Sequence, residues 1–391
     1  MQSELLWRLK SHELSDIAEK VIEGERLSLH DGIRLYRSHD IAAVGSLANI
    51  VRERKSGNRT YYIVNRHINY TNLCVNRCPL CAFSRDRDAP DAYTLSVDEI
   101  VDASGDVERN GATELHIVGG LHPDLPLSYY THMLSALKER YPTVHLQAFT
   151  VVEIAHMARI ERTTVTGILR RLRGAGLGSI PGGGAEIFGA RVRSIICPRK
   201  ISGEEWLETA RAAHLLGIKS NATMLYGHVE TIEERLLHML VLRETQDETG
   251  GFMSFIPLPF HPANTRLAMC PGPTGIDDLK TIAVSRLMLD NFDHIKAFWI
   301  MLGPKLAQVS LAFGADDMDG TVAEERITHA AGARTPQRLA PEEIVGLIRE
   351  AGREPAQRDT VYGVVSQRSG AGSGASTGCG GMCAVQKKDR R

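Results

Sequence analysis

The pattern of apolar and polar positions divides the chain into an N-terminal helical stretch and a longer repeating stretch. Residues 1–58 predict helices, and Ser28 with Asp31 forms a capping box before one of them. From residue 59 onward, short apolar runs alternate with amphipathic stretches. The apolar runs predict buried strands at residues 61–69, 114–120, 145–150, 179–187, 220–227, 251–260, 295–302 and 310–315.

Helix-start signals separate these strands. A proline at residue 341, followed by two glutamates, is typical of a first helical turn. Capping boxes precede three other amphipathic stretches, at Ser96-x-x-Glu99, Ser202-x-x-Glu205 and Thr231-x-x-Glu234. Eight strands that alternate with helices predict an α/β fold, a (β/α)8 barrel of the TIM type over residues 59–350. A doubly wound open sheet is the alternative, because its parallel strands are also short and apolar.

Composition sets limits on the class of protein. The chain has 391 residues, of which 43% are hydrophobic, and a formal net charge of −1. The near-neutral charge argues against a nucleic-acid partner. The N-terminus has no apolar h-region and no run of 18 apolar residues occurs, so we expect neither a secretory signal nor a membrane span. Seven cysteines, an odd number, do not suggest a disulfide framework, and a reducing cytoplasm fits best.

The C-terminal segment, residues 351–391, departs from this pattern. Residues 366–378 are rich in Gly and Ser, a composition that cannot bury enough apolar surface to fold, so we predict a disordered tail. The tail carries Cys379 and Cys383. These thiols could bind a metal, form a redox disulfide, or have no role.

Three cysteines close together carry the strongest chemical signal. Cys74, Cys78 and Cys81 make the spacing Cys-x3-Cys-x2-Cys. Three thiolates can hold three irons of a [4Fe–4S] cube. Because no fourth cysteine lies nearby, the fourth iron stays open to a small molecule. A structural zinc site would need four closed ligands, and neither His67 nor Cys197 has the spacing of a zinc finger.

Two loops at predicted strand ends are candidates for binding a ligand. Gly119 and Gly120 end a predicted strand, and without a Cβ Gly120 lets a ligand approach the backbone. Residues 181–185 are glycine-rich but lack the GxxxxGK[ST] pattern of a phosphate loop. Glu186, which follows them, is placed to hold a ribose diol, as an acidic residue does in dinucleotide sites.

The cysteine loop resembles the cluster loop of the radical S-adenosylmethionine (SAM) enzymes. The resemblance implies that SAM chelates the open iron and that an electron from the cluster releases a 5′-deoxyadenosyl radical. It also implies that Gly119 and Gly120 meet the methionine amino group of SAM, although Leu121 replaces the acid of the usual Gly-Gly-Glu. Leu80 stands where the family usually has an aromatic residue near the adenine.

A second motif of that family matches the fifth predicted strand. Leu225, Gly227 and Glu230 fit the pattern Gly-x-Ile-x-Gly-x-x-Glu that lies beside the adenine, with Thr223 in place of the first glycine. Longer stretches between about residues 10 and 350 resemble one branch of the family, the synthase of the futalosine route to menaquinone. They include HIVGGLHPDLP, PGGGAEIF, HLLGIKSNATMLYGHVE and SLAFGADDMDGTVAEERITHAAGA.

The resemblance implies a radical addition to a small molecule. The deoxyadenosyl radical would add to the vinyl ether of 3-[(1-carboxyvinyl)oxy]benzoate, and loss of the carboxyl carbon would give 6-amino-6-deoxyfutalosine. SAM would be consumed as a co-substrate, and flavodoxin or ferredoxin would supply electrons. Because the substrate carries two carboxylates, we expect donors at strand ends to face it: His122, Arg191, Arg193 and His261. His228, with Tyr226 in the same segment, is the candidate for catalysis near the migrating carboxylate.

Other functions stay open at this point. The cyclase of the same route has the same fold and cluster but abstracts hydrogen before closing a ring. The deazaflavin-cofactor synthase is a further relative. The segments 196–198, 226–228 and 259–262 favour the synthase. A non-enzymatic iron–sulfur or zinc regulator is a rival of another class, but it would have no need of the glycine-edged strand ends.

Overall fold

A computed structural model describes residues 13–105 and 107–365. The predicted disordered tail, with Cys379 and Cys383, therefore lies outside the described residues, as do the first twelve positions. None of the helices within the described ranges has both the length and the apolar character needed to cross a membrane.

Parallel strands close into a barrel. Two three-stranded sheets form most of the wall, one of β2 (Asn65–Ile68), β3 (Glu114–Ile117) and β4 (His145–Ala148), the other of β5 (Ser220–Tyr226), β6 (Phe252–Pro259) and β7 (His294–Ile295). The third sheet joins β8 (Asp317–Gly320), β1 (Arg59–Ile63) and β9 (Glu354–Gln357). Isolated bridges link β4 through residues 179–180 to β5, β7 to β8, and β2 to residue 323. The predicted (β/α)8 barrel is thus confirmed, with β1 and β2 as successive parts of one wall segment.

The last two of the eight predicted strands are wrong. Residues 295–302 were expected to form a strand, but β7 ends at Ile295 and Trp299–Leu302 is helix α13. Residues 310–315 were also expected to be a strand, yet they finish helix α14 (Pro304–Ser310) and the turn after it. The real strand, β8, reads Asp-Met-Asp-Gly. Its Asp317 is accommodated because Arg358 Nε donates to it at 2.7 Å inside the barrel. Hydrophobic periodicity in the sequence does not predict a strand that buries a carboxylate, because the arginine that neutralises it is distant in the chain.

Helices surround the barrel and begin where the caps predict. Helices α5 (Val97–Ser104), α10 (Gly203–Leu215) and α11 (Ile232–Thr249) start at the three expected capping boxes, and Pro341 opens α16 (Pro341–Glu350). The remaining helices of the outer layer are α6 (Leu127–Arg140), α7 (Val151–Ile160), α8 (Val165–Gly174), α9 (Ala190–Ile196) and α12 (Gly275–Met288), whereas the short α15 (Ile327–Ala330) lies at the mouth of the barrel.

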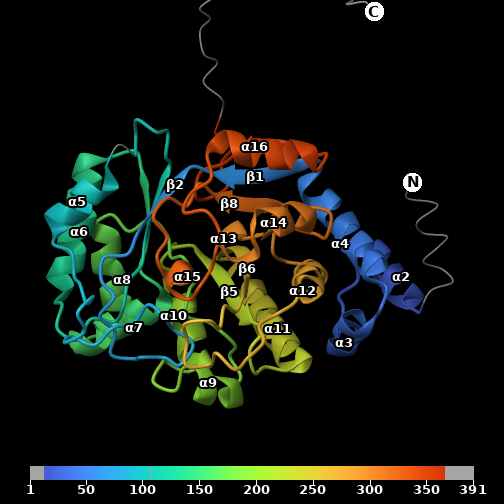
Figure 1. The fold of residues 1–391 in the computed structure, drawn as a ribbon, viewed down its shortest axis with the longest axis horizontal. Helices are drawn as coiled ribbons and strands as arrows, with labels where there is room; N and C mark the ends of the chain where they lie inside the picture. Colours follow the sequence, from blue (N-terminus) through green and yellow to red (C-terminus); the bar gives the residue numbers. More distant parts are fainter. Residues whose placement is uncertain (1–12, 106, 366–391) are drawn as a thin grey trace, which may run out of the picture.

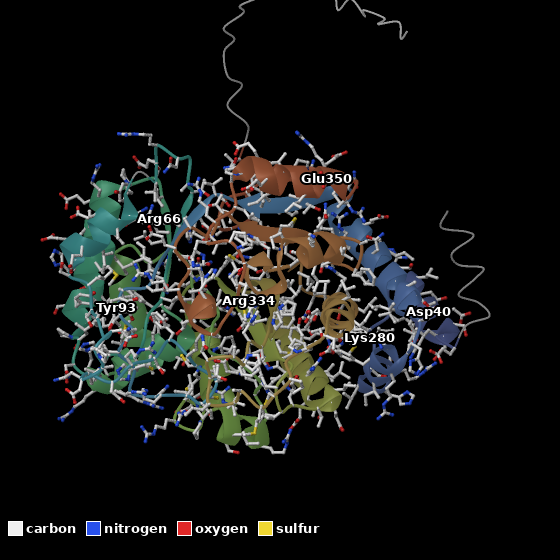
Figure 2. All side chains as sticks on the ribbon, in the orientation of Figure 1. Asp40, Arg66, Tyr93, Lys280, Arg334 and Glu350 are labelled. Carbon is white, nitrogen blue, oxygen red and sulfur yellow. The ribbon has the colours of Figure 1, made fainter. Side chains whose placement is uncertain are left out.

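Three N-terminal helices pack on one side of the barrel, beside α12 (Figure 1). They are α2 (Ser15–Glu23), α3 (Leu29–Arg37) and α4 (Ile41–Ser56), and α3 begins at the predicted Ser28 capping box. Lys280 of α12, labelled in Figure 2, helps to hold them. Its ammonium donates to the carbonyls of Tyr36 and Ser38 at 2.9 and 2.7 Å. At the other end of the chain, β9 pairs with β1 and so continues the barrel wall beyond residue 350, where we had placed the boundary.

The inside of the barrel is polar near the carboxyl ends of its strands. We call five buried or partly buried side chains there the polar floor: His67, His116, Gln147, Lys296 and Asp319. Branched apolar residues usually fill this position in a TIM-type barrel. A polar filling at this end therefore marks the place where a polar ligand can be received.

Candidate functional site

A cavity of about 340 Å³ opens at the carboxyl ends of the strands, where barrels of this type carry their chemistry. Its wall comes from the cysteine loop after β2, the loop after β3, residues 181–186, the ends of β5 and β6, and the segment from β8 to α15. Eight of the predicted site residues line it: Cys74, Cys78, Leu80, Cys81, Gly119, Gly120, Glu186 and His261.

Backbone hydrogen bonds hold the cysteine loop against the barrel. The amide of Cys74 donates to the carbonyl of Arg85 at 3.2 Å, and the amide of Val75 donates to the carbonyl of Leu121 at 3.0 Å. The amide of Cys81 donates to the carbonyl of Cys78 at 3.0 Å, which closes a turn between two of the thiols. The loop thus places three thiols on one wall of the cavity.

The three thiols suit a cluster better than a single ion. In the described part of the chain, no three His, Cys, Asp or Glu side chains converge closely enough to hold one metal ion. A tetrahedral zinc site needs that convergence, whereas a [4Fe–4S] cube gives each thiolate its own iron. Burial raises the pKa of Cys78 to about 12, so an iron that binds this thiol would have to displace its proton.

The two glycines after β3 are needed for packing against the cysteine loop. A Cβ on Gly120 would lie 2.1 Å from the carbonyl oxygen of Leu73, directly before the first cysteine. A Cβ on Gly119 would lie 2.7 Å from the ring of Tyr70. We predicted that Gly120 lets a ligand approach the backbone. The structure shows that a glycine is needed here in any case, because a side chain would collide with the cysteine loop.

A buried carboxylate lies behind these glycines. Glu153 accepts hydrogen bonds from the amide of Gly119 at 3.1 Å and from the hydroxyl of Tyr70 at 2.7 Å. Burial raises the pKa of Glu153 to about 6, while the hydrogen bonds from Thr150 and Tyr70 oppose the shift. Glu153 fixes the position of the Gly119 backbone at the cavity wall.

Glu186 pairs with a lysine that the sequence did not single out. The Lys200 ammonium donates to the Glu186 carboxylate, and both side chains line the cavity. Burial opposes ionisation of Glu186, but the lysine outweighs it and keeps the pKa of Glu186 below its usual value. Arg193, which we predicted to face the substrate, points elsewhere: its guanidinium donates to the carbonyl of Ala185 at 2.6 Å and supports the loop of Glu186.

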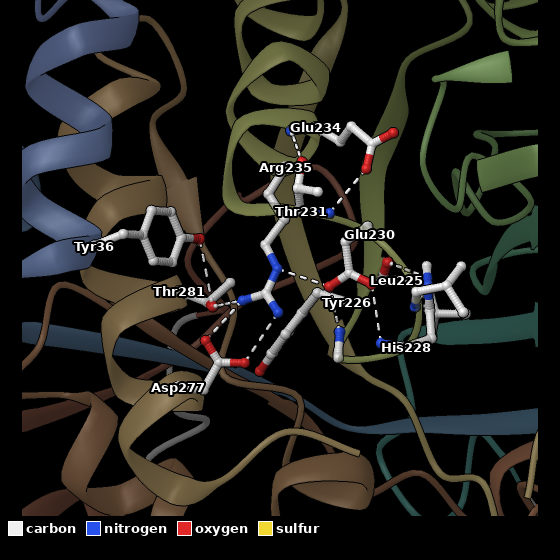
Figure 3. A network of polar contacts seen from close by, with 12 residues as sticks. Tyr36, Leu225, Tyr226, His228, Glu230, Thr231, Glu234, Arg235, Asp277 and Thr281 are labelled. Carbon is white, nitrogen blue, oxygen red and sulfur yellow. Dashed lines mark hydrogen bonds and ion pairs between the residues drawn. The ribbon is translucent and has the colours of Figure 1, made fainter. Parts of the chain in front are cut away.

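Tyr226, His228 and Glu230 do not line the cavity, although we placed them at the site. They belong to a network behind β5 (Figure 3). The hydroxyl of Tyr226 donates to Asp278 at 2.8 Å, and the Glu230 carboxylate accepts from the amides of Gly227 and His228 at 2.6 and 2.9 Å. His228 is fully buried, with Nε2 3.0 Å from the carbonyl of Leu225. Their predicted roles in catalysis and cofactor binding stay predictions.

The other predicted substrate residues are held in different ways. Arg191 is exposed and forms a salt bridge with Glu234 at 2.5 Å. His122 Nδ1 accepts from two amides of its own loop and does not line the cavity. His261 does line it, with Nε2 2.9 Å from the carbonyl of Met301. Of the four predicted substrate donors, the structure thus brings only His261 to the cavity.

The polar floor is the part of the site that sequence reasoning missed. Two of its members alternate with apolar neighbours inside predicted strands, His116 in ELHIVGG and Gln147 in HLQAFT. A polar side chain at every second position of a buried strand marks the inward face, and that signal could have identified them. His67 follows Arg66, Lys296 is a single polar position at the start of the predicted strand 295–302, and Asp319 lies outside the predicted strands, so these three gave no such signal.

Comparison with known proteins places this geometry in a family. Residues 68–241 match the Radical SAM superfamily, and residues 249–369 match the CofH/MqnC C-terminal region. The solved structure of methylornithine synthase has a TM-score of 0.68 with this chain, covering 87% of it and 97% of the synthase at 20% identity. That likeness supports the barrel fold alone.

Relatives with higher identity span nearly the whole chain. Aminodeoxyfutalosine synthase of Thermus thermophilus is 50% identical, with 90% of this chain and 96% of that protein covered. Aminodeoxyfutalosine synthase of Streptomyces coelicolor is 45% identical, covering 91% and 95%. The 5-amino-6-(D-ribitylamino)uracil–L-tyrosine 4-hydroxyphenyl transferase of Methanothermobacter thermautotrophicus is also 45% identical, but covers 83% and 89%.

Proposed function

We propose that this chain, which belongs to the radical SAM superfamily, is an aminodeoxyfutalosine synthase of menaquinone biosynthesis. As a radical SAM enzyme it uses a [4Fe–4S] cluster and SAM. The observation that carries the finer proposal is the 50% identity to the Thermus thermophilus synthase over 96% of that protein. The reaction would join the adenosyl part of SAM to 3-[(1-carboxyvinyl)oxy]benzoate, with loss of the carboxyl carbon.

Residues of the cavity wall would hold the two cofactors. Cys74, Cys78 and Cys81 would ligate the cluster, which supplies the electron that cleaves SAM when both are bound. The amide of Gly120 already donates to the carbonyl of Thr71 at 2.9 Å. The methionine amino group is itself a donor, so it would meet carbonyl oxygens of this segment. Glu186 would accept from the ribose diol, next to the Lys200 ammonium that keeps it ionised.

The upper wall of the cavity would shield the radical from water. Leu80, Leu225, Ile256, Leu258 and Phe260 line this part. Apolar side chains there would exclude water and hold the reactive carbon against the vinyl ether, so that addition outpaces abstraction of a hydrogen atom from a neighbouring group. An electron donor such as flavodoxin or ferredoxin would reduce the cluster from outside.

A second candidate follows from the archaeal relatives. At 45% identity, the transferase of Methanothermobacter thermautotrophicus matches this chain as well as the Streptomyces coelicolor synthase does. It acts, by its name, on a ribitylaminouracil and tyrosine. The higher identity to the Thermus thermophilus synthase, 50% against 45% for this transferase, favours the synthase.

Isotope-labelled SAM separates the candidates. The anaerobically reconstituted full chain is incubated with dithionite, SAM labelled in the adenosine, and one of three substrates: the vinyl-ether benzoate, tyrosine with the ribitylaminouracil, or dehypoxanthine futalosine. A synthase puts the label into a product with the mass of aminodeoxyfutalosine. Label found only in free 5′-deoxyadenosine, together with a product from tyrosine or from a cyclised futalosine derivative, would overturn the proposal.

A further inference from the structure

His67 of the polar floor has a ring nitrogen without a partner. Its side chain is 5% exposed and lines the cavity, and its Nε2 finds no hydrogen bond among the described residues. The ring stacks on His116 at a centroid distance of 4.3 Å, which fixes its orientation. Leaving a buried polar atom unpaired is unfavourable, and because His67 borders the cavity, a ligand bound there can supply the missing partner.

A lysine of the same floor has donors to spare. Lys296 is 5% exposed, and its ammonium donates to Asp319 at 3.2 Å. An ammonium carries three N–H donors, and this contact uses one of them. Asp319 also lies 3.9 Å from Arg358, so its charge is shared between two cations.

Charge distribution in the cavity assigns the two lysines different partners. Lys200 and Lys296 are the Lys or Arg side chains that line it within the described ranges. Lys200 forms an ion pair with Glu186 and lies near Cys78. Its positive charge is therefore on the side of the cysteine loop and not at the polar floor. Lys296 is bonded to Asp319 at the floor and keeps two N–H donors for an anion. Glu114, deeper in the barrel, accepts from Asn65 at 3.2 Å and interacts electrostatically with His116 and Lys296.

We propose that His67 and Lys296 bind the ring carboxylate of the substrate at the polar floor, an inference that rests on the synthase function proposed above. The Nε2–H of His67 would donate one hydrogen bond, and the Lys296 ammonium a second that carries charge. The vinyl ether would then point up the cavity toward the cysteine loop. The ring carboxylate becomes the group by which the enzyme selects its substrate.

Substitution of His67 by Phe gives the sharpest test, because that nitrogen bonds to nothing in the protein. His67→Phe keeps a ring against His116 and removes only the donor. We expect an unchanged melting temperature and about a 10-fold fall in kcat/KM on the carboxylated substrate, the loss for one charge-assisted bond. On 2-phenoxyacrylate, which lacks the ring carboxylate, kcat/KM should not change. Exposed His132→Phe is the matched control.

Lys296→Met extends the test, with exposed Lys305→Met as its control. We expect a loss of about 10- to 100-fold on the carboxylated substrate. Because the variant leaves Asp319 without its lysine, Lys296→Met/Asp319→Asn is measured beside it. Equal losses on both substrates, or none, in the His67 and Lys296 variants would overturn the subsite.

Binding measured by calorimetry without reductant keeps the two proposals apart. If the wild-type protein binds the carboxylated ligand through these residues but makes no adenosylated product, the synthase reaction fails and the subsite stands. If the product forms and the variants keep the wild-type preference for the ring carboxylate, the subsite fails and the synthase reaction stands.

Discussion

Replacement of Gly120 by alanine should disrupt the cysteine loop before it affects SAM. The added Cβ would lie 2.1 Å from the carbonyl oxygen of Leu73, against a comfortable separation of ~3.5 Å between non-bonded heavy atoms. A backbone carbonyl cannot swing away as a side chain can. The segment that carries Cys74 must therefore move by about 1 Å, and the thiol moves with it.

The magnitude follows from typical costs of overpacking. Such insertions destabilise by about 1–3 kcal/mol, and the backbone contact puts Gly120→Ala toward the upper end. For a large domain this corresponds to a fall of about 2–6 °C in melting temperature. We also expect reconstituted Gly120→Ala to hold clearly less iron and sulfide than the wild type, with weaker absorption near 400 nm.

A second glycine provides the matched control. A Cβ on Gly346, inside α16, would meet nothing within 4 Å. Gly346→Ala should therefore keep full iron and gain about 0.5–1 kcal/mol of stability from its higher helix propensity. If Gly120→Ala retains full iron and the wild-type melting temperature, the packing argument is refuted. If it retains iron but loses SAM affinity, the glycine serves ligand approach alone.

Three further outcomes are expected. Cys78→Ala should abolish SAM cleavage, measured as the release of 5′-deoxyadenosine, whereas Cys270→Ala, at a buried cysteine outside the loop, should retain it. Cleavage by the Cys78 variant would show that Cys78 does not ligate the cluster. Hydrogen bonding to Glu325 raises the pKa of His329 to about 9, so the stability that protonated His329 contributes is complete below pH 6.5 and is lost as the pH rises to 9. His329→Gln should therefore differ from the wild type in melting temperature at pH 6 but little at pH 9.5. A difference that stays constant with pH would contradict this. Arg235→Met leaves the buried carboxylate of Glu230 and the partly exposed carboxylate of Asp277 without their cation. It should destabilise by about 3–5 kcal/mol in denaturant unfolding, and wild-type stability would show that the network behind β5 contributes little.

Local signals in the sequence were sufficient for the outer parts of the fold. The capping boxes at Ser96, Ser202 and Thr231 each begin a helix, because a hydroxyl and a carboxylate three residues apart satisfy free amides wherever the chain goes next. The alternation of apolar runs with these helices predicted the barrel. The spacing of the three cysteines predicted the kind of cofactor, since neighbours in sequence also lie together in space.

Tertiary structure decided which of the loop residues face the cavity. His228 and Arg193 lie after predicted strand ends, yet both donate to backbone carbonyls and neither lines the cavity, while His67, Lys200 and Lys296 come from separate wall segments and all line it. Strand β8 shows the same limit, because its Asp317 and Asp319 are stable in the interior through Arg358 and Lys296, which come from other segments of the chain. Burial of a charge depends on its partner in space, and a one-dimensional pattern carries no information about that partner.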